Sequence, residues 1–296
     1  MFGPLEFILA GVLVGFCVGI TGVGGGSLMT PILITLLRVE PHIAIGTDLL
    51  YAAISKFCGS LVHAKKMNIV WPIVIWLAVG SIPASFATHW VLDNFLSQST
   101  HYKSVLTMVL GFMLTLTGVS IVFRAQVEKF FSKYRKPESS DLTFDMEKVK
   151  QQAKDKRSYI IFMGIVLGIF ATLSSVGAGA FGIMALILMF PNLPMIRIIG
   201  SDVVLAVLLT LVAGLGHMSA GNVDFTLLGW LLCGSIPAIV IGTLISSRMP
   251  EKFIRKVLGI TLFCLGINFI VNPVKSKPVK AAEPVATMQV EKAQSI

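Results

Sequence analysis

Charged residues are scarce in this chain. Only 13% of its 296 residues are Asp, Glu, Lys or Arg, whereas soluble domains carry about 25%. Hydrophobic residues make up 55% of the chain, and the mean hydropathy is +0.84. This balance excludes an ordinary soluble domain and predicts an integral membrane protein.

Motifs of catalysis, of metal binding and of nucleotide binding are also missing. The four cysteines have neither zinc-ligand spacing nor a disulfide framework. Residues 177–182 fit the pattern G-x-G-x-x-G, but they follow an apolar helical segment and not a strand, so they are no dinucleotide fingerprint. No P-loop and no H-E-x-x-H motif occurs. We therefore expect no ATP, no zinc, no other cofactor and no enzyme activity.

The excess of nine positive charges does not indicate a nucleic-acid partner. Ten of the 24 basic residues lie between Arg124 and Arg157, four between Arg248 and Lys256, and four after Pro273. They flank apolar segments, as the positive-inside rule for membrane proteins expects. The charge therefore predicts how the chain is oriented in a lipid bilayer.

Apolar runs of the roughly 20 residues needed to cross a bilayer occur six times. They cover 42–63, 69–91, 104–123, 196–216, 225–246 and 253–271. Two more apolar regions, 5–37 and 159–190, are too long for one span and are interrupted by glycines. Each is expected to form a re-entrant hairpin or a pair of short spanning helices, and the sequence leaves both open.

The glycine clusters mark the interruptions. Gly24, Gly25 and Gly26 stand together in the first region, and Gly177 and Gly179 in the second. One glycine inside a helix costs about 1 kcal/mol relative to alanine, so the clusters predict breaks. Backbone groups freed inside a bilayer must be satisfied by protein or by a water-filled cavity. The breaks therefore predict the lining of a site at membrane depth.

The two halves of the chain repeat each other. A shift of 154 residues superimposes residues 46–84 on 200–238 without a gap, with 13 identities in 39 positions. Both copies contain the sequence GSIPA, and both contain an aspartate after a hydroxyl residue. Repeats of this kind build many secondary transporters.

Charge bias suggests that the two copies are inverted. Lys65 and Lys66 follow His63, whereas the loop after His217 has no basic residue. The loop after the GSIPA helix is rich in basic residues in the second copy and poor in them in the first. Equivalent loops therefore have opposite charge bias. In this arrangement the C-terminal tail lies outside the cell, although its lysines would favour the cytoplasmic side. We give more weight to the charges of the loops between the spans.

The expected fold class is an all-α polytopic membrane protein with two inverted repeats, each a glycine-broken helical hairpin plus three spanning helices. The expected divisions are a first transmembrane repeat over 1–123, a polar cytoplasmic linker over 124–158, a second repeat over 159–271 and a disordered polar tail over 272–296.

Charged side chains within the spans are candidates for function because they are costly at that depth. Asp48 and Asp202 lie about two turns into their spans, and Thr47 and Ser201 place a hydroxyl beside each. A helix cap or an interfacial position is the alternative for the aspartates. Lys56 has no charged counterpart in the second half; it could attract an anion or neutralise an aspartate.

Two prolines within the spans and two histidines at the ends of spans can each be explained by a structural role or by a functional one. Pro83 and Pro237 each remove a backbone donor near the centre of a span, so they predict a packing kink or a helix break that acts as a hinge. His63 and His217 close their helices, where an interfacial or helix-dipole role is the ordinary one and proton coupling the alternative.

The chain resembles the TauE/SafE family, the sulfite-exporter-like permeases of bacterial membranes. The resemblance rests on residues 15–31 with the GVGGGS run, on 44–53 and 80–84, and on their second-half counterparts. It implies secondary transport of a small organic anion or a sulfur oxyanion such as sulfite or a sulfonate. It also implies a multi-pass protein of the bacterial inner membrane.

We expect the half-helix N-termini at 24–27, which include Ser27, and at 177–180 to bind the anion, because free N–H groups and the helix dipole favour negative charge there. The alternatives are an ion or small-solute channel and a non-transporting membrane scaffold. The expected partners are a small anion and the lipid bilayer. The sequence leaves open whether a proton or a sodium ion is coupled, and whether the chain forms a homo-oligomer.

Overall fold

The computed structural model describes residues 3–21, 26–65, 69–96, 102–134, 146–176, 179–191, 193–246 and 251–273, and these residues form helices and connections without a strand. The helices of the first half are α1 (Pro4–Thr21), α2 (Gly26–Thr35), α3 (Pro41–Lys65), α4 (Trp71–Val91), a π-helical turn η1 (Leu92–Leu96) and α5 (Tyr102–Tyr134). Those of the second half are α6 (Met146–Asp155), α7 (Arg157–Ser174), α8 (Ala180–Met189), α9 (Met195–Ser219), α10 (Phe225–Ser246) and α11 (Glu251–Val271).

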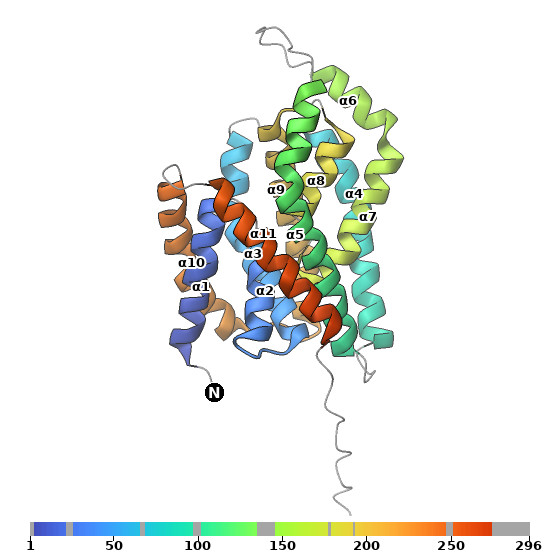
Figure 1. The fold of residues 1–296 in the computed structure, drawn as a ribbon. Coiled ribbons are helices and arrows are strands. Elements are labelled where there is room, and N and C mark those ends of the chain that lie inside the picture. Colours follow the sequence, from blue (N-terminus) through green and yellow to red (C-terminus); the bar gives the residue numbers. More distant parts are fainter. Residues whose placement is uncertain are drawn as a thin grey trace, which may run out of the picture.

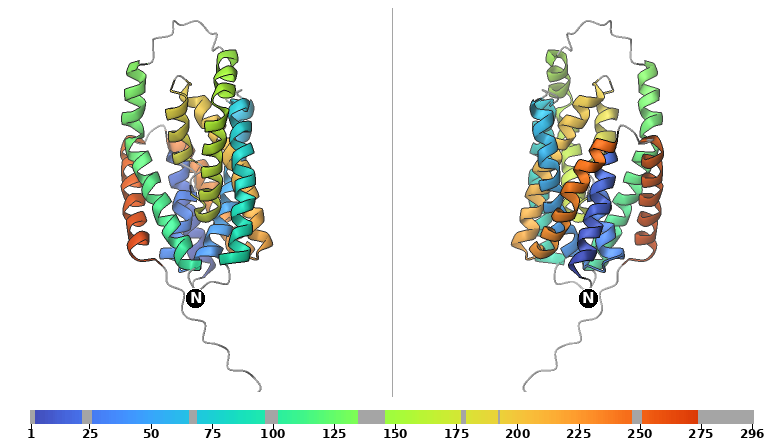
Figure 2. Two further views of the ribbon diagram at one scale, coloured as in Figure 1. Left: turned by 90° about the vertical axis from the view of Figure 1, so that its right-hand side faces the viewer. Right: turned by 90° about the vertical axis from the view of Figure 1, so that its left-hand side faces the viewer.

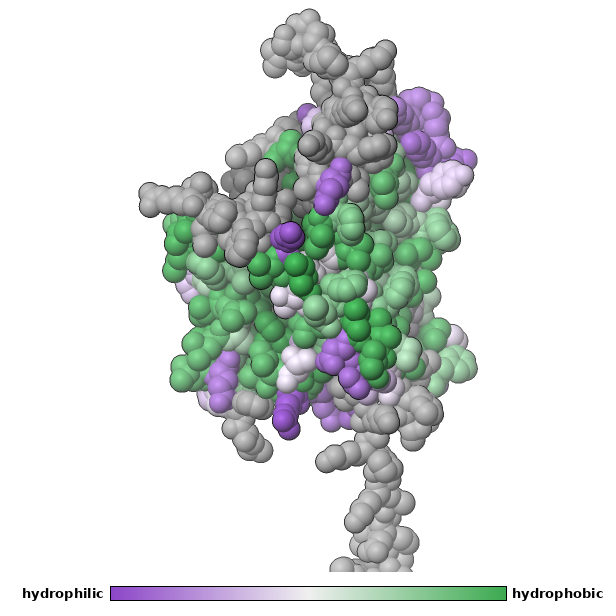
Figure 3. All heavy atoms as spheres, in the orientation of Figure 1, coloured by the Kyte–Doolittle hydropathy of each residue, from purple (hydrophilic) through white to green (hydrophobic). Residues whose placement is uncertain are grey.

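The six predicted spans coincide with α3, α4, α5, α9, α10 and α11. Within the described residues, five helices are long and apolar enough to cross a membrane: α4 with η1, the apolar part of α5, α7, α9 and α10. Large apolar side chains such as Phe86, Phe162 and Leu244 are exposed around the bundle. On the face drawn in Figure 3, hydrophobic side chains form a band, with hydrophilic side chains over α6 and near the opposite end. The chain is therefore a multi-pass membrane protein.

The two glycine-interrupted regions form helical hairpins that enter the bundle from opposite ends. In Figure 1, α1 starts at the lower end and α2 leads back to it, whereas α7 starts at the upper end and α8 leads back to that end. The start of α1 and the end of α11 lie at the lower end, and α6 lies at the upper end (Figures 1 and 2). Of the two forms left open by the sequence, the hairpin is the one observed.

Proline and a left-handed residue set several helix boundaries. Pro41 begins α3, Pro72 lies in the first turn of α4, and Pro194 is the N-cap of α9; proline suits a helix start because the amide it lacks has no partner there. At the end of α7, Ser175 takes φ 57° and stops the helix. Gly179 takes φ 136° directly before α8, a conformation that side-chain-bearing residues avoid.

Contacts between the halves occur as equivalent pairs. Gly11 of α1 packs against the carbonyl of Leu231 in α10, and Gly164 of α7 packs in the same way against Leu77 in α4. A Cβ at either glycine would collide with that carbonyl oxygen. Small residues let membrane helices approach closely, so these glycines fix the pairing of α1 with α10 and of α7 with α4. The remaining pair, α5 and α11, packs along one side of the bundle (Figure 2).

The polar region after the third span contains two helical segments. α5 continues to Tyr134, eleven residues beyond the predicted end of the span at 123, and α6 covers Met146–Asp155. The extension is possible because a helix needs apolar residues only where it crosses lipid. Most of the predicted tail lies outside the described residues.

Candidate functional site

Two short helices begin inside the bundle. α2 and α8 each contain 10 residues, which is about 15 Å of helix, or half the roughly 30 Å of bilayer hydrocarbon. Figure 1 shows them in the middle of the bundle, one in its lower half and one in its upper half. The first amides of a helix have no partner within it, so each start presents N–H donors and the positive end of a dipole.

The predicted glycines fall at these helix starts. Gly26 is the first residue of α2, followed by the buried Ser27, and Gly179 is the N-cap of α8. Gly24, Gly25 and Gly177 lie outside the described residues. Their part in substrate binding therefore stays a prediction.

Asp48 joins both hairpins. Its carboxylate is fully buried in α3 and accepts a hydrogen bond from the hydroxyl of Thr30 in α2. From the end of α7, the hydroxyl of Ser175 faces the same carboxylate. Within the described residues, neither that hydroxyl nor the Oδ1 atom of Asp48 completes a hydrogen bond of good geometry. The aspartate predicted from the first repeat thus lies where the two interrupted regions meet.

Lys56 lies eight residues after Asp48 on the same helix and is half-buried. Its ammonium group interacts electrostatically with the carboxylates of both Asp48 and Asp202. Asp202 is buried in α9. Lys56 therefore lies within electrostatic range of both aspartates that the sequence singled out. The arrangement supports the neutralising role that the sequence left open for Lys56.

Thr47 and Ser201 make equivalent hydrogen bonds across the repeats. The amide of Asp224 donates to Oγ1 of Thr47 over 3.1 Å, and the amide of Val70 donates to Oγ of Ser201 over 2.9 Å. Asp224 corresponds to Val70 under the shift of 154 residues. Both hydroxyls therefore hold the connection that precedes a helix of the other half. Substrate contact by these two residues stays a prediction.

Pro83 and Pro237 do not interrupt their helices. α4 runs from Trp71 to Val91 and α10 from Phe225 to Ser246, each with its proline inside. The predicted break is absent because the loss of one donor leaves the neighbouring hydrogen bonds of the helix intact. The neighbouring glycines, Gly80 and Gly234, also pack tightly against α7 and α1. A hinge function of the prolines stays a prediction.

Several buried polar residues escaped the sequence interpretation. Thr30 and Ser175 stand within a turn of the glycine clusters, and that proximity was the available signal. For His217 the sequence favoured an interfacial or helix-dipole role, with proton coupling as the alternative; its side chain is fully buried and lies 3.0 Å from the carbonyl oxygen of Thr172, with which it forms a hydrogen bond. The side chain of His63 lies outside the described residues.

No group of three His, Cys, Asp or Glu residues in the described part of the chain could hold a metal ion. A groove of about 440 Å³ between α4, α5 and α7 is lined by apolar side chains such as Val105, Ile165 and Leu173, and contains none of the predicted site residues.

An ion pair ties the connection after α2 to the start of α5, next to the predicted spans 42–63 and 104–123. Nζ of Lys103 lies 2.9 Å from Oε1 of Glu40. The hydrogen bond from Lys103 holds the pKa of Glu40 below its usual value. This pair secures the end of the first hairpin, which carries Thr30.

Comparison with known proteins places the chain among membrane transporters. The family model described as "Sulfite exporter TauE/SafE" matches residues 7–269. The chain is 34% identical over 266 residues to the probable membrane transporter protein YjnA of Bacillus subtilis, which covers 90% of this chain and 99% of that protein. It is 24% identical to the probable membrane transporter protein YdhB of the same organism, over 88% of this chain and 97% of that protein.

A third relative comes from an archaeon. The probable membrane transporter protein MJ0441 of Methanocaldococcus jannaschii is 22% identical over 86% of this chain and 92% of that protein. No solved structure matches the chain significantly. The family match spans both glycine-interrupted hairpins and all six predicted spans, so this chain belongs to the TauE/SafE family of membrane proteins.

Proposed function

We propose that this chain is a secondary transporter that moves a small organic anion or a sulfur oxyanion, such as sulfite or a sulfonate, across the cytoplasmic membrane. The observation that carries the proposal is the meeting of the two hairpins at Asp48, which is bonded to Thr30 in α2 and faces Ser175 at the end of α7. Two helix N-termini at mid-depth suit an anion because their amides and dipoles favour negative charge.

The proposed transport mechanism uses two inverted repeats. The equivalent contacts of Gly11 with Leu231 and of Gly164 with Leu77 support this symmetry. The reciprocal hydrogen bonds of Thr47 and Ser201 also support it. In such transporters the repeats rock about a site at the bilayer midplane and expose it alternately to the two sides.

The charged triad suits such a site. Asp48 and Asp202 carry two negative charges against one on Lys56, and an unbalanced buried charge is costly. One bound coupling cation would neutralise this excess negative charge, whereas an anion bound alone would add to it. The triad therefore favours coupled transport over passive conduction by a channel.

Proteoliposomes test the proposal. Purified protein is reconstituted and supplied with radiolabelled sulfite, sulfoacetate or ethanesulfonate, and with labelled glycerol as an uncharged control. We expect saturable uptake of at least one anion and counterflow, in which unlabelled anion inside the vesicles drives accumulation of label. Uptake that neither saturates nor shows counterflow would indicate a channel, and the absence of any uptake would contradict anion transport of this class.

A pair of glycine variants tests the position of the site. Gly179 and Gly221 both have positive φ, at 136° and 74°, so leucine strains the backbone at each. Gly221 has open space around it in the connection after α9. We expect Gly179→Leu to abolish anion uptake while the protein still inserts into membranes, and Gly221→Leu to retain uptake. Equal uptake by the two variants would remove the start of α8 from the site.

A further inference from the structure

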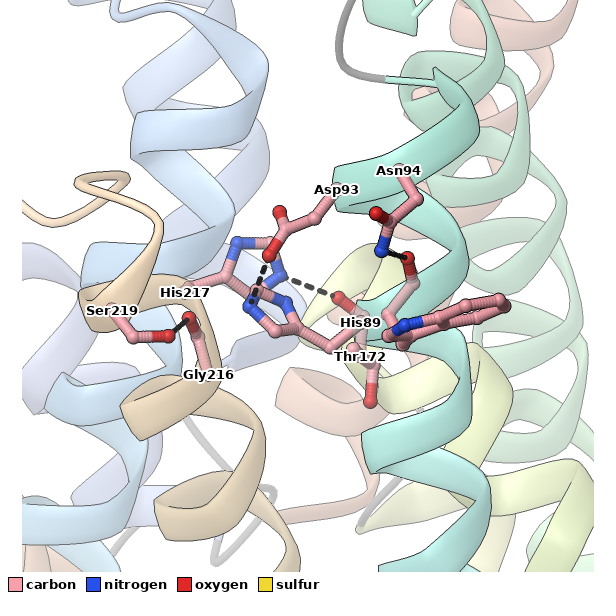
Figure 4. Close-up of polar contacts among 8 residues, drawn as sticks. His89, Asp93, Asn94, Thr172, Gly216, His217 and Ser219 are labelled. Atoms are coloured by element: carbon pink, nitrogen blue, oxygen red, sulfur yellow. Dashed lines mark hydrogen bonds and ion pairs between the residues drawn. The ribbon is translucent and has the colours of Figure 1, made fainter.

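A second polar cluster lies away from the charged triad, where α4 and α9 end. Nε2 of His89 lies 3.2 Å from Oδ2 of Asp93, one turn later in η1. The ring centroids of His89 and His217 are 5.5 Å apart. Figure 4 shows the two imidazoles side by side, with Asp93 above His89 and the Thr172 carbonyl beside His217. Gly216 leaves room for the ring of His89, since a Cβ there would lie 3.1 Å from it.

The hydrogen bond of His217 defines its tautomer. Nε2 lies 3.0 Å from the carbonyl oxygen of Thr172. A carbonyl only accepts hydrogen bonds, so Nε2 carries the hydrogen and Nδ1 of the neutral ring is a bare acceptor. That Nδ1 atom is buried and has no hydrogen-bond partner among the described residues. A buried acceptor without a partner is costly and requires an explanation.

The surroundings of the histidine pair leave room for at most one proton. Asp93 contributes one negative charge next to His89. His42 faces His217 electrostatically from α3, and Tyr102 faces Asp93 from α5. Lys103, beside Tyr102, is paired with Glu40. One carboxylate therefore faces two neighbouring imidazoles, and a second proton would place two positive charges close together.

Exposure falls along the cluster from solvent to the interior. The side chain of Asp93 is 42% exposed and that of His89 is 12% exposed, whereas His217 is fully buried. Asp93 also belongs to the π-helical turn η1, and π-turns are frequent at functional sites. This order suits entry of a proton from water by way of Asp93 and His89, whose two ring nitrogens complete no hydrogen bond of good geometry among the described residues.

We propose that His89, Asp93 and His217 bind the proton that is coupled to anion transport; this inference rests on the proposed function. The proton comes from water at the end of the bundle where α4 ends, and only O–H and N–H bonds form and break. On His217 it places positive charge against the last turn of α7. Ser175, three residues after Thr172, faces Asp48 in the anion site. The bound proton thereby strengthens binding of the anion, and the proton and the anion are released on the same side.

The second half of the chain lacks this cluster. Thr243 and Ser247 stand at the positions that correspond to His89 and Asp93 under the shift of 154 residues. Proton exchange through this cluster therefore takes place with one face of the membrane. Because of this asymmetry, net transport of the anion depends on protons. Exchange of one anion for another across the membrane does not.

The test separates net transport from exchange. Vesicles that contain the pH dye pyranine receive sulfoacetate outside, and the proton movement that follows is recorded. In His89→Gln, His217→Gln and Asp93→Asn we expect proton movement to fall at least tenfold, while exchange of labelled sulfoacetate at equal concentrations continues. His42→Gln is the matched control and should retain both. Wild-type proton movement in His217→Gln, or the same loss in His42→Gln, would overturn the proposal.

Nuclear magnetic resonance of the unmodified protein tests the site without transport or variants. Histidine is labelled with ¹⁵N in both ring nitrogens, and spectra are recorded in detergent while the pH is lowered. We expect one ring of the pair to become protonated at Nδ1 and the other to stay neutral. Two rings that both stay neutral until the protein unfolds would overturn the proposal. Protonation in a protein that moves no sulfoacetate would instead contradict that substrate and leave the proton site standing.

Discussion

Thr30 in α2 donates a hydrogen bond to the carboxylate of Asp48 in α3, and both side chains are fully buried. This bond ties the short helix of the first hairpin to the span that carries the charged triad. Because the carboxylate also faces Ser175 of the other hairpin, any change at Asp48 reaches both interrupted regions.

The Thr30–Asp48 bond should be measurable as a coupling energy. Hydrogen bonds to charged groups contribute about 1.5–3 kcal/mol, so Thr30→Val should destabilise the protein by that amount and lose most of the effect when Asp48→Leu is also present. Thr35→Val is the control, because its hydroxyl bonds only to the carbonyl of Pro31 in its own helix. Thermal unfolding in detergent of the double-mutant cycle checks this. Additive effects of the two changes would show that the bond contributes nothing.

Lys56→Met distinguishes a structural from a substrate-binding lysine. Since Lys56 interacts with Asp48 and Asp202, we expect the single variant to lose stability, because it removes the positive charge that faces two buried carboxylates. Adding Asp48→Asn or Asp202→Asn should restore part of the loss. Unfolding temperature and anion binding are measured on all variants. A stable single variant that binds the anion more weakly would assign Lys56 to the substrate instead.

Close helix packing should make Gly80 intolerant of side chains. A Cβ at Gly80 would collide with the carbonyl oxygen of Ile161 in α7, whereas Gly229 in α10 has open space around it. Overpacking costs about 1–3 kcal/mol, so Gly80→Val should unfold at lower temperature and Gly229→Val should not. Equal unfolding temperatures of the two variants would mean that α4 and α7 can move apart without a loss of stability.

The proposed topology places α6 and the α9–α10 connection on opposite sides of the membrane. Gln151 and Ser219 are exposed at these two places. In a background with the native cysteines replaced by alanine, Gln151→Cys should react with an impermeant maleimide only from the cytoplasmic side. Ser219→Cys should react only from the other side. Reaction of both from one side would contradict the inverted arrangement.

Acid should weaken the Glu40–Lys103 pair. The pKa of Glu40 is lowered in the folded protein by its hydrogen bond with Lys103, so the stabilisation is present above the unfolded pKa and is lost as the pH falls through the folded one. Its size is below about 1 kcal/mol, since the Glu40 side chain is 52% exposed. Lys103→Gln should remove this pH dependence from the unfolding temperature, and Lys150→Gln, in an exposed pair with Glu147, should not. The same pH profile in both variants would contradict the assignment.

The amino-acid sequence by itself determined the membrane class, the presence of a helix at each of the six predicted spans and the two interrupted regions. These properties depend on local quantities: the length of apolar runs, the helix-breaking tendency of clustered glycines and the cost of a charge in lipid. The identities between the halves also pointed to Asp48 and Asp202, and the residues around the glycines carried the family resemblance. The structure places Asp48, Asp202 and Lys56 together because their helices, α3 and α9, are equivalent elements packed against each other.

Only the tertiary structure decided what those residues touch. The hydroxyls of Thr47 and Ser201 hold backbone amides that lie 177 and 131 residues away in the chain, and no local pattern specifies such partners. The continuity of α4 and α10 through their prolines depends on the remaining hydrogen bonds of each helix and on its packed neighbour. The pairing of His89 with His217 arises because α4 packs on α9. Long-range packing therefore decided which of the polar residues along the sequence meet.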